Sequence, residues 1–265
     1  MHDKTNTLAA RAASKVPEVA IGFWVIKIAA TTLGETGGDW VSMSLQFGYL
    51  VGSAIFLLVF IALLWSQVKA ERFRPVLYWA TIVATTTLGT TLADFADRSI
   101  GLGYPGGVAL VASLLAASLA TWYWSEGSVS IESITRPKVE WFYWVTILFS
   151  QTLGTALGDW AAGSDRGGLG LGYELGAILF GSGLVVVAGL YLWSRVSHTL
   201  LFWIAFILTR PLGATVGDLL DKPLAAGGLN LSRLYASLAL LGFMAACIYV
   251  IPQRPAPSGK TRDSN

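Results

Sequence analysis

The sequence predicts an all-α membrane protein with eight transmembrane helices. Its composition, the length of its apolar runs and an internal fourfold repeat lead to this prediction. Hydrophobic residues make up 54% of the chain and charged residues 13%, whereas a soluble domain has about 25% charged residues. The mean hydropathy of +0.60 is typical of a polytopic membrane protein. The net charge of +2 gives no reason to expect nucleic acid as a partner.

The repeat is clearest in residues 144–159. A tryptophan opens an apolar run of helical length, and a Leu-Gly pair and then an aspartate follow it. In every copy the glycine lies ten residues after the tryptophan and the aspartate five residues after the glycine. The four copies are Trp24, Gly34 and Asp39; Trp79, Gly89 and Asp94; Trp144, Gly154 and Asp159; and Trp203, Gly213 and Asp218. Four copies with no insertion indicate a tandem-repeat architecture.

Each repeat predicts a helix hairpin, in which two spans are joined by a short acidic loop. The repeats cover about 17–68, 75–124, 141–194 and 199–251. The first spans are 17–34, 78–93, 141–158 and 200–217, and the second spans are 47–65, 104–124, 173–193 and 231–251. Spans of about twenty residues match a hydrocarbon core of about 30 Å. Strands are not expected, because the runs do not alternate and an open sheet edge cannot face lipid.

The two tails and the orientation follow from the polar residues. Residues 1–16 are predicted to be a cytoplasmic tail, since no cleavage site of a signal peptide follows them. Residues 252–265 are polar and predicted to be disordered. Lysine and arginine gather in the tails and in the links between repeats, and the loops within repeats hold only Arg98, Arg166, Lys222 and Arg233. The positive-inside rule therefore predicts that both termini are cytoplasmic.

Two spans per repeat make all four repeats point the same way across the membrane. Such parallel repeats are related by an axis along the membrane normal, in a pseudo-fourfold or a two-plus-two arrangement. The distance from tryptophan to aspartate corresponds to about 22 Å of helix, which places the aspartates near the outer interface. A fourfold arrangement would gather Asp39, Asp94, Asp159 and Asp218 in a ring. Rings of carboxylates select cations, so these four are the predicted metal ligands.

A plainer interpretation of the Gly-Asp pair competes with the ring. Glycine suits a helix C-terminus and aspartate is a good N-cap, so the pair could simply turn the chain. If the carboxylates do bind an ion, oxygen ligands without Cys or His favour hard cations: Mg²⁺, Mn²⁺, Ca²⁺, Na⁺ or a coupling H⁺. No cofactor is expected beyond such a bound cation.

The repeats are not equivalent. Glu35 occurs only in the first, and Asp97 and Asp221 complete Asp-x-x-Asp pairs in the second and fourth. Arg210 lies deep in a span of the fourth repeat and needs a carboxylate or carbonyl partner, with Glu35 and Asp39 as first candidates. The predicted transport path consists of Glu35, Asp39, Asp94, Asp97, Asp159, Arg210, Asp218 and Asp221.

Other polar and aromatic residues receive conventional interpretations. Lys27 is expected to extend its ammonium to the near interface. The tryptophans and the Gly-Tyr pairs that open the second spans are expected in the aromatic belts. Threonines before the repeat glycine either line a polar path or bond to carbonyls of their own helix. These are Thr31, Thr32, Thr85, Thr86, Thr87 and Thr152.

Four two-span units with this Trp–Leu-Gly–Asp frame resemble a bacterial family defined by a tandem repeat of unknown function, described as uncharacterised membrane-anchored proteins. The resemblance covers residues 17–251. It implies four repeats and a location in the bacterial inner membrane, and it implies no activity.

Three functions are compatible with the sequence. The first is a transporter or channel for a small hard cation, which is not an enzyme and has the lipid bilayer and the cation as its partners; its oligomeric state is left open. The second is a scaffold or membrane-stress protein without catalytic activity. The third is a Mg²⁺-dependent enzyme that acts on a lipid diphosphate through the Asp-x-x-Asp pairs.

Overall fold

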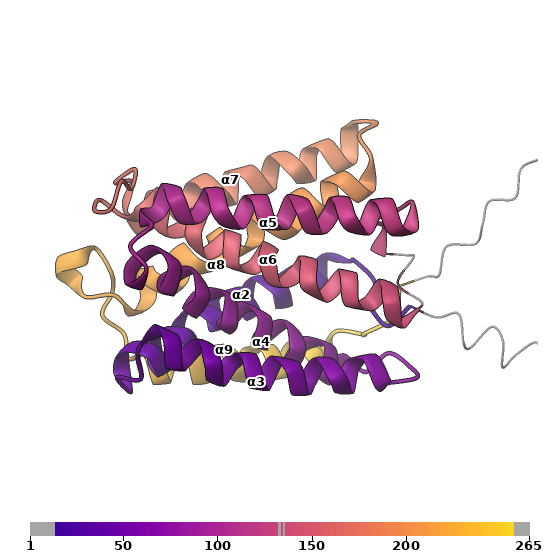
Figure 1. Cartoon of the computed structure of the whole chain (residues 1–265), viewed down its shortest axis with the longest axis horizontal. Helices are drawn as coiled ribbons and strands as arrows, with labels where there is room; N and C mark the ends of the chain where they lie inside the picture. The colour runs from indigo at the N-terminus through magenta and orange to yellow at the C-terminus, as the bar shows by residue number, and fades with distance from the viewer. Residues whose placement is uncertain (1–13, 132–133, 135, 257–265) are drawn as a thin grey trace, which may run out of the picture.

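The computed structural model describes residues 14–131, 134 and 136–256, and within them eight long α-helices form four consecutive pairs (Figure 1). The first helices of the pairs are α2 (Ile21–Asp39), α4 (Pro75–Asp94), α6 (Pro137–Ala162) and α8 (His198–Asp221). The second helices are α3 (Gly48–Lys69), α5 (Gly103–Glu126), α7 (Gly172–Trp193) and α9 (Arg233–Val250). The prediction of an all-helical chain with four two-helix units is confirmed.

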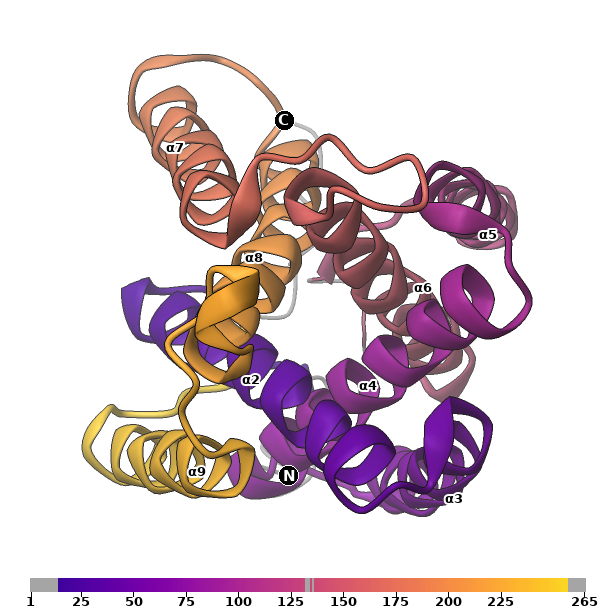
Figure 2. The same cartoon turned by 90° about the vertical axis from the view of Figure 1, so that its left-hand side faces the viewer.

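The first helices of the four units form a closed inner ring. Viewed along the long axis, α2, α4, α6 and α8 surround the centre and the second helices lie outside them (Figure 2). Each inner helix contacts the next, and α8 contacts α2 to close the ring. In the most apolar 18-residue stretch of each helix, 72% of α4 and 67% of α8 is buried. The corresponding share in the four outer helices is 11% to 22%. The units therefore have the predicted pseudo-fourfold arrangement.

The helix-hairpin part of the prediction is wrong, because each outer helix packs on a different unit. Helix α3 lies along α4, α5 along α6, α7 along α8, and α9 returns to lie along α2. The connection between the two helices of a unit leads the chain from the inner helix of that unit to the outer face of the next inner helix. It does so at a glycine with positive φ, which is Gly48 (71°), Gly103 (68°) or Gly172 (74°) in the first three units. Since glycine has no Cβ, this left-handed conformation costs it little.

The repeat glycines set the spacing of the inner ring. A Cβ added to Gly34 would lie 2.1 Å from the Thr86 hydroxyl oxygen, and one added to Gly213 would lie 2.2 Å from that of Thr31. Gly154 packs in the same way against the side chain of Arg210. At two of these crossings a threonine hydroxyl donates to the facing helix, from Thr86 to Ala30 O (3.2 Å) and from Thr31 to Thr209 O (3.1 Å). In lipid the hydrophobic effect does not drive helices together, so close packing at small residues contributes more to their association.

The threonines of these helices bond mainly to their own backbone. Each of the six hydroxyls donates to a carbonyl three or four residues earlier, at 2.7 to 3.0 Å. The interpretation that they satisfy their own helix is confirmed, and it leaves them with little free capacity to line a polar path.

Three of the four repeat tryptophans are buried, so the belt interpretation is wrong for these three, while Trp24 is half-buried. Trp79 and Trp144 are each 1% exposed and Trp203 is 5% exposed. They pack with the aromatic residue that precedes each of them, and the Tyr78 and Tyr143 hydroxyls hydrogen-bond to each other at 2.7 Å. Four adjacent aromatic pairs therefore fill one end of the inner ring, because each unit contributes one pair at the same level.

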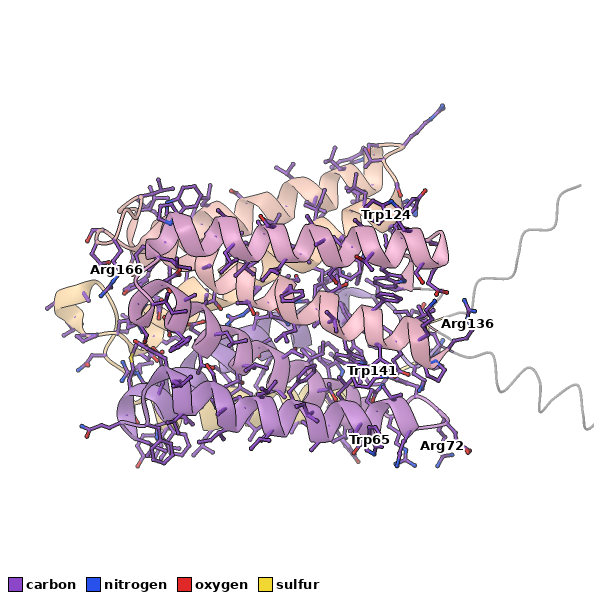
Figure 3. All side chains as sticks on the ribbon, viewed as in Figure 1. Trp65, Arg72, Trp124, Arg136, Trp141 and Arg166 are labelled. Carbon is purple, nitrogen blue, oxygen red and sulfur yellow. The ribbon has the colours of Figure 1, made fainter. Side chains whose placement is uncertain are left out.

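The tryptophans on the outside fit the belt interpretation. Figure 3 shows Trp65, Trp124 and Trp141 with Arg72 and Arg136 at one end of the molecule, and Arg166 at the other. Trp65 is 57% exposed and Trp124 81%. Aromatic and basic side chains at one level are typical of a membrane interface.

Six of the helices in the described part of the chain are long and apolar enough to cross a membrane: α3, α4, α5, α7, α8 and α9. Helices α2 and α6 are long enough to cross a membrane, but neither contains a sufficiently apolar stretch of 18 residues. Their glycines, threonines and charged residues instead face the ring, where 13 residues of α2 and 17 of α6 are buried. The molecule thus has the character of a multi-pass membrane protein, with its most polar helices inside.

The segments next to the termini meet at the aromatic end of the ring. Pro17 pairs with Pro255, and the Ala256 amide donates to Val16 O at 2.8 Å. The prediction of disorder is therefore wrong for residues 252–256, while residues 1–13 and 257–265 lie outside the described part of the chain. Lys15, predicted to be in a tail, is buried and forms a 2.6 Å ion pair with Glu140.

Candidate functional site

The Gly-Asp pairs lie within helices, so the turn interpretation is wrong. After Asp39 the chain continues as a π-helical turn, η1 (Trp40–Ser44), and after Asp94 as η2 (Phe95–Ser99). Helices α6 and α8 continue to Ala162 and Asp221 beyond their aspartates. Neither Asp39 nor Asp94 makes a side-chain cap bond to the turn that follows it. All four carboxylates are buried, at 0% to 4% exposure, which requires partners for them.

Two basic residues supply those partners. Arg98 lies four residues after Asp94, and its guanidinium lies 3.1 Å from that carboxylate and 3.2 Å from Asp159 of the next unit. Lys222 lies four residues after Asp218, 3.0 Å from its Oδ1, and its ammonium also bonds Asp39 Oδ2 of the first unit. The four carboxylates are therefore gathered as two cation-bridged pairs instead of the single ring that the sequence predicted.

The two pairs give the fourfold ring a two-plus-two character. Arg98 and Lys222 occupy the same repeat position, and each joins its own unit to the following one. The prediction of the site missed both residues, along with Arg233, which lies 3.2 Å from Asp221. A signal was present: a basic residue four positions after a helical aspartate shares its face, and this spacing occurs only in the second and fourth units.

Arg210 binds Glu35, as predicted, in the middle of the ring. Its Nη2 lies 3.1 Å from Glu35 Oε2 and donates to Thr86 O at 3.3 Å. Its Nη1 donates a hydrogen bond to Thr31 O at 3.2 Å, and its Nη2 also donates to the Thr90 hydroxyl. Because α8 and α4 lie on opposite sides of the ring, the side chain crosses its centre. The second predicted partner, Asp39, is bound by Lys222 instead.

Three carboxylates on α2 and α8 come close enough to share a cation. One oxygen each from Glu35, Asp39 and Asp218 lies within 4.8 Å of the others, the one such group in the described part of the chain. Asp39 is fully buried and its Oδ1 has no hydrogen-bond partner among the described residues. The facing half of the ring offers Thr155 where Glu35 stands, so Asp94 and Asp159 lack a third carboxylate. Of the four predicted metal ligands, only Asp39 and Asp218 belong to this group.

The Asp-x-x-Asp pairs do not form shared sites. Asp97 points to α5, where a Cβ on Gly107 would lie 1.7 Å from its Oδ1. Neither of its oxygens has a hydrogen-bond partner among the described residues. Asp221 accepts from Arg233 at 3.2 Å. Among the described residues Arg98 forms an ion pair with Asp94 but not with Asp97, and Lys222 forms one with Asp218 but not with Asp221.

The ammonium of Lys222 is charged in this environment. Burial by itself lowers the pKa of Lys222, but the carboxylates of Asp218, Asp39 and Asp221 raise it more, and the pKa lies well above its usual value. Opposite charges at these distances favour the protonated amine. The residue therefore places a positive charge at the edge of the three-carboxylate group.

Lys27 does not reach the interface, so that prediction is wrong. Its side chain is fully buried, its ammonium lies 3.7 Å from the centroid of the Phe206 ring, and it has no hydrogen-bond partner among the described residues. The ring of Phe206 gives a cation–π contact in place of solvent. Gln151, also fully buried, has an amide with no partner there.

The tyrosines that open the outer helices divide into two kinds. Tyr49 accepts a hydrogen bond from Arg98 at 3.0 Å, and Tyr104 donates to Asp165 at 3.1 Å. The belt interpretation is wrong for Tyr104, which is 4% exposed, whereas Tyr49 is half-buried. Tyr235, in the fourth unit, is 73% exposed and fits the belt.

Comparisons with known proteins bear on the repeat and not on an activity. No curated protein and no solved structure matches this chain. The family model described as Repeat of Unknown Function (DUF347) matches residues 22–73, 77–128, 142–197 and 201–251. These four segments coincide with the four units of the structure and cover most of the chain, so the protein belongs to this family of tandem repeats.

Proposed function

We propose that this protein is a multi-pass transporter for a small hard cation in a bacterial inner membrane. All eight helices cross the bilayer in this proposal, and both termini are cytoplasmic. The apolar faces of the outer helices, the six apolar spans and the basic end with its exposed tryptophans support this placement. The inner helices α2 and α6 cross with most of their polar residues buried in the ring, away from lipid.

The observation that carries the proposal is the convergence of Glu35, Asp39 and Asp218. Three buried carboxylates with oxygens within 4.8 Å of one another need positive charge nearby, and Arg210 and Lys222 supply two cations for the three groups. Carboxylate oxygens are the ligands of hard cations, with Mn²⁺, Mg²⁺ and Ca²⁺ first among them. The group lies at the end of the ring away from the termini, which is the outer side in this orientation.

The interior of the ring favours a transporter over an open channel. Arg210 crosses the centre beside Glu35, and the aromatic pairs around Tyr78 and Tyr143 fill the opposite end. A cation that enters from the outer side meets the three carboxylates first and the guanidinium next. Passage then requires Arg210 and the aromatic end to move, as alternating access demands.

A flux measurement tests this function. In proteoliposomes we expect uptake of at least one of Mn²⁺, Mg²⁺, Ca²⁺ and Na⁺. The Asp39→Asn variant should reduce that uptake about tenfold or more, because it removes a charged ligand oxygen. Asp165→Asn, in an exposed loop, is the matched control and should retain uptake. Absence of uptake of all four cations by the folded wild-type protein would contradict the proposal, as would full uptake by Asp39→Asn.

The scaffold alternative has one observation in its favour. The ion pairs join different units, Arg98 linking the second to the third and Lys222 the fourth to the first. The same variants separate the two functions: in a scaffold, Asp39→Asn lowers the melting temperature, and the wild-type protein shows no uptake. The lipid-diphosphate alternative receives no comparable support, because the Asp-x-x-Asp pairs do not converge.

A further inference from the structure

The environment of Lys222 suggests how the cation site is kept closed before a cation arrives. Its ammonium bonds Asp39 Oδ2 and lies 3.0 Å from Asp218 Oδ1. These are two of the three carboxylates that could hold a metal ion. The positive charge of the protein itself thus occupies part of the volume that a bound cation would need.

We propose that Lys222 is a tethered counter-cation, which holds the Glu35–Asp39–Asp218 site until a divalent cation displaces it. The inference rests on the proposed function and goes beyond it in naming the residue that controls the site and the charge of the ion.

The chain allows the lysine to leave while its backbone stays in place. Lys222 follows the last residue of α8, and its carbonyl accepts a hydrogen bond from the Asn230 amide at 2.9 Å. Neighbouring loop amides bond Leu219 O and Leu220 O at 2.7 and 2.8 Å, so the loop is held against the helix end. The flexible four-carbon stem of lysine lets the ammonium swing without moving these bonds.

The pseudo-twofold mate of Lys222 is built differently. Arg98 is held by Asp94 and Asp159 and also donates to Tyr49 at 3.0 Å. A planar guanidinium with three fixed partners is pre-organised and hard to displace. No third carboxylate stands beside it, since Thr155 occupies the position of Glu35. In one half of the ring, Lys222 can be displaced and a third carboxylate is present for a bound ion. In the other half, Arg98 remains bound to its two aspartates.

Charge balance selects a divalent ion. When ionised, Glu35, Asp39 and Asp218 carry three negative charges, of which the buried Arg210 balances one. Arg233, 3.9 Å from Asp39, is paired with Asp221, so these two residues cancel in the count. With Lys222 gone the group has a net charge of two negative charges, which a divalent cation neutralises and a monovalent one does not. Uncompensated charge in a buried site is strongly unfavourable. The lysine and Na⁺ are thus comparable competitors, whereas Mn²⁺ or Ca²⁺ has the advantage.

Amine labelling of the intact wild-type protein tests the displacement directly. In detergent, acetylation of Lys222 by an N-hydroxysuccinimide ester is followed by mass spectrometry with and without saturating Mn²⁺. We expect Mn²⁺ to raise the labelling rate of Lys222 about tenfold, a coupling of ordinary size for competing ligands. Na⁺ at the same ionic strength should not raise it. Exposed Lys138 is the internal control and should label equally in all conditions.

Binding of Mn²⁺, followed by its electron paramagnetic resonance signal, provides a second test. Lys222→Met should bind Mn²⁺ about tenfold more tightly than wild type, since the internal competitor is removed. Arg98→Met, at the matched repeat position, should show no such gain because it lacks a third carboxylate.

The outcomes separate this inference from the proposed function. If wild-type protein binds Mn²⁺ but Lys222 labels no faster and Lys222→Met binds no tighter, the counter-cation role is overturned and the cation site stands. If Na⁺ releases Lys222 as well as Mn²⁺ does, the assignment to divalent ions is overturned. If neither wild type nor Lys222→Met binds Mn²⁺, both the site and the inference are overturned.

Discussion

At the scale of single residues, Arg210 and Glu35 form a buried ion pair whose charges depend on each other. Both side chains are buried, at 0% and 3% exposure, and they lie 3.1 Å apart at the centre of the ring. Two buried charges are tolerated here because each neutralises the other and because the carbonyl oxygens of Thr31 and Thr86 accept hydrogen bonds from the guanidinium. Glu35 therefore serves two neighbours: Arg210 on the inner side and the cation group on the outer side.

Removal of one partner of this pair should be much worse than removal of both. Arg210→Met leaves a buried carboxylate without its partner and should lower the free energy of unfolding by about 3–5 kcal/mol. The double variant Arg210→Met/Glu35→Gln should recover more than half of that loss, because no unpaired charge remains. Thermal unfolding of the purified protein in detergent measures the difference.

Arg72→Gln is the control for the Arg210 and Glu35 variants, since Arg72 lies at the exposed end of the molecule. Its effect should stay within about 0.5 kcal/mol. An Arg210→Met variant as stable as the Arg72→Gln control would show that the central pair does not support the ring.

At the scale of elements, the repeat glycine explains how four helices with polar faces pack so closely. Gly34, Gly154 and Gly213 each lie against the residue three positions before the glycine of the neighbouring unit: Thr86, Arg210 and Thr31. The regular offset places equivalent residues at one level around the ring. This is why the aromatic pairs meet at one end and the aspartates at the other.

Substitution of these glycines should be costly, and the chain offers a matched control. Gly34→Ala places a Cβ 2.1 Å from the Thr86 hydroxyl, and Gly242→Ala, in outer helix α9, meets no atom within 4 Å. We expect Gly34→Ala to destabilise the protein by about 1–3 kcal/mol through overpacking. Gly242→Ala should be neutral or stabilising by up to about 1 kcal/mol, because alanine favours helix. Equal melting temperatures for the two variants would argue against close packing at Gly34.

At the scale of the whole molecule, the exchange of outer helices makes the four units interdependent. Helix α9 of the last unit lies on α2 of the first, where the Thr36 and Ser237 hydroxyls are 2.8 Å apart. Helix α5 lies on α6 of the next unit, where Ser118 and Thr146 are 2.7 Å apart. The two halves of the chain therefore contact each other through the α9–α2 interface and through the α5–α6 interface. For this reason they are not expected to fold separately.

Disulfide trapping tests this closure. In a Cys247→Ser background, Thr36→Cys/Ser237→Cys should form a disulfide on mild oxidation, which would join the first unit to the last. Cleavage of the chain between α5 and α6 would then leave two fragments linked on a non-reducing gel. Ser113→Cys/Ser237→Cys, with Ser113 exposed on α5, should leave the fragments separate. Fragments that separate in both variants would mean that α9 does not return to α2.

The sequence predicted the parts of this architecture that depend on regular spacing. The Trp–Gly–Asp frame predicted the number of units and their common direction, and the position of Arg210 deep in a span predicted its pairing with Glu35. It did not reveal that α3 packs on α4 instead of α2, because an apolar outer helix fits either neighbour equally well. Nor did it separate Trp79 from Trp65, since both are tryptophans at span ends and only packing places one inside. The spacing of Lys222 from Asp218 could have revealed that pair, but its second partner, Asp39, lies 183 residues away in the first unit and only the fold brings the two together.

The central claim is that Glu35, Asp39 and Asp218 bind one hard cation between the fourth and first units. An anomalous difference map from crystals grown with Mn²⁺ tests it most directly. The account predicts one strong peak about 2.0–2.6 Å from an oxygen of each carboxylate, the range for hard cations, with the Lys222 ammonium moved away from Asp39. A map that shows no peak there at saturating Mn²⁺, with Lys222 still bound to Asp39 and Asp218, would contradict it.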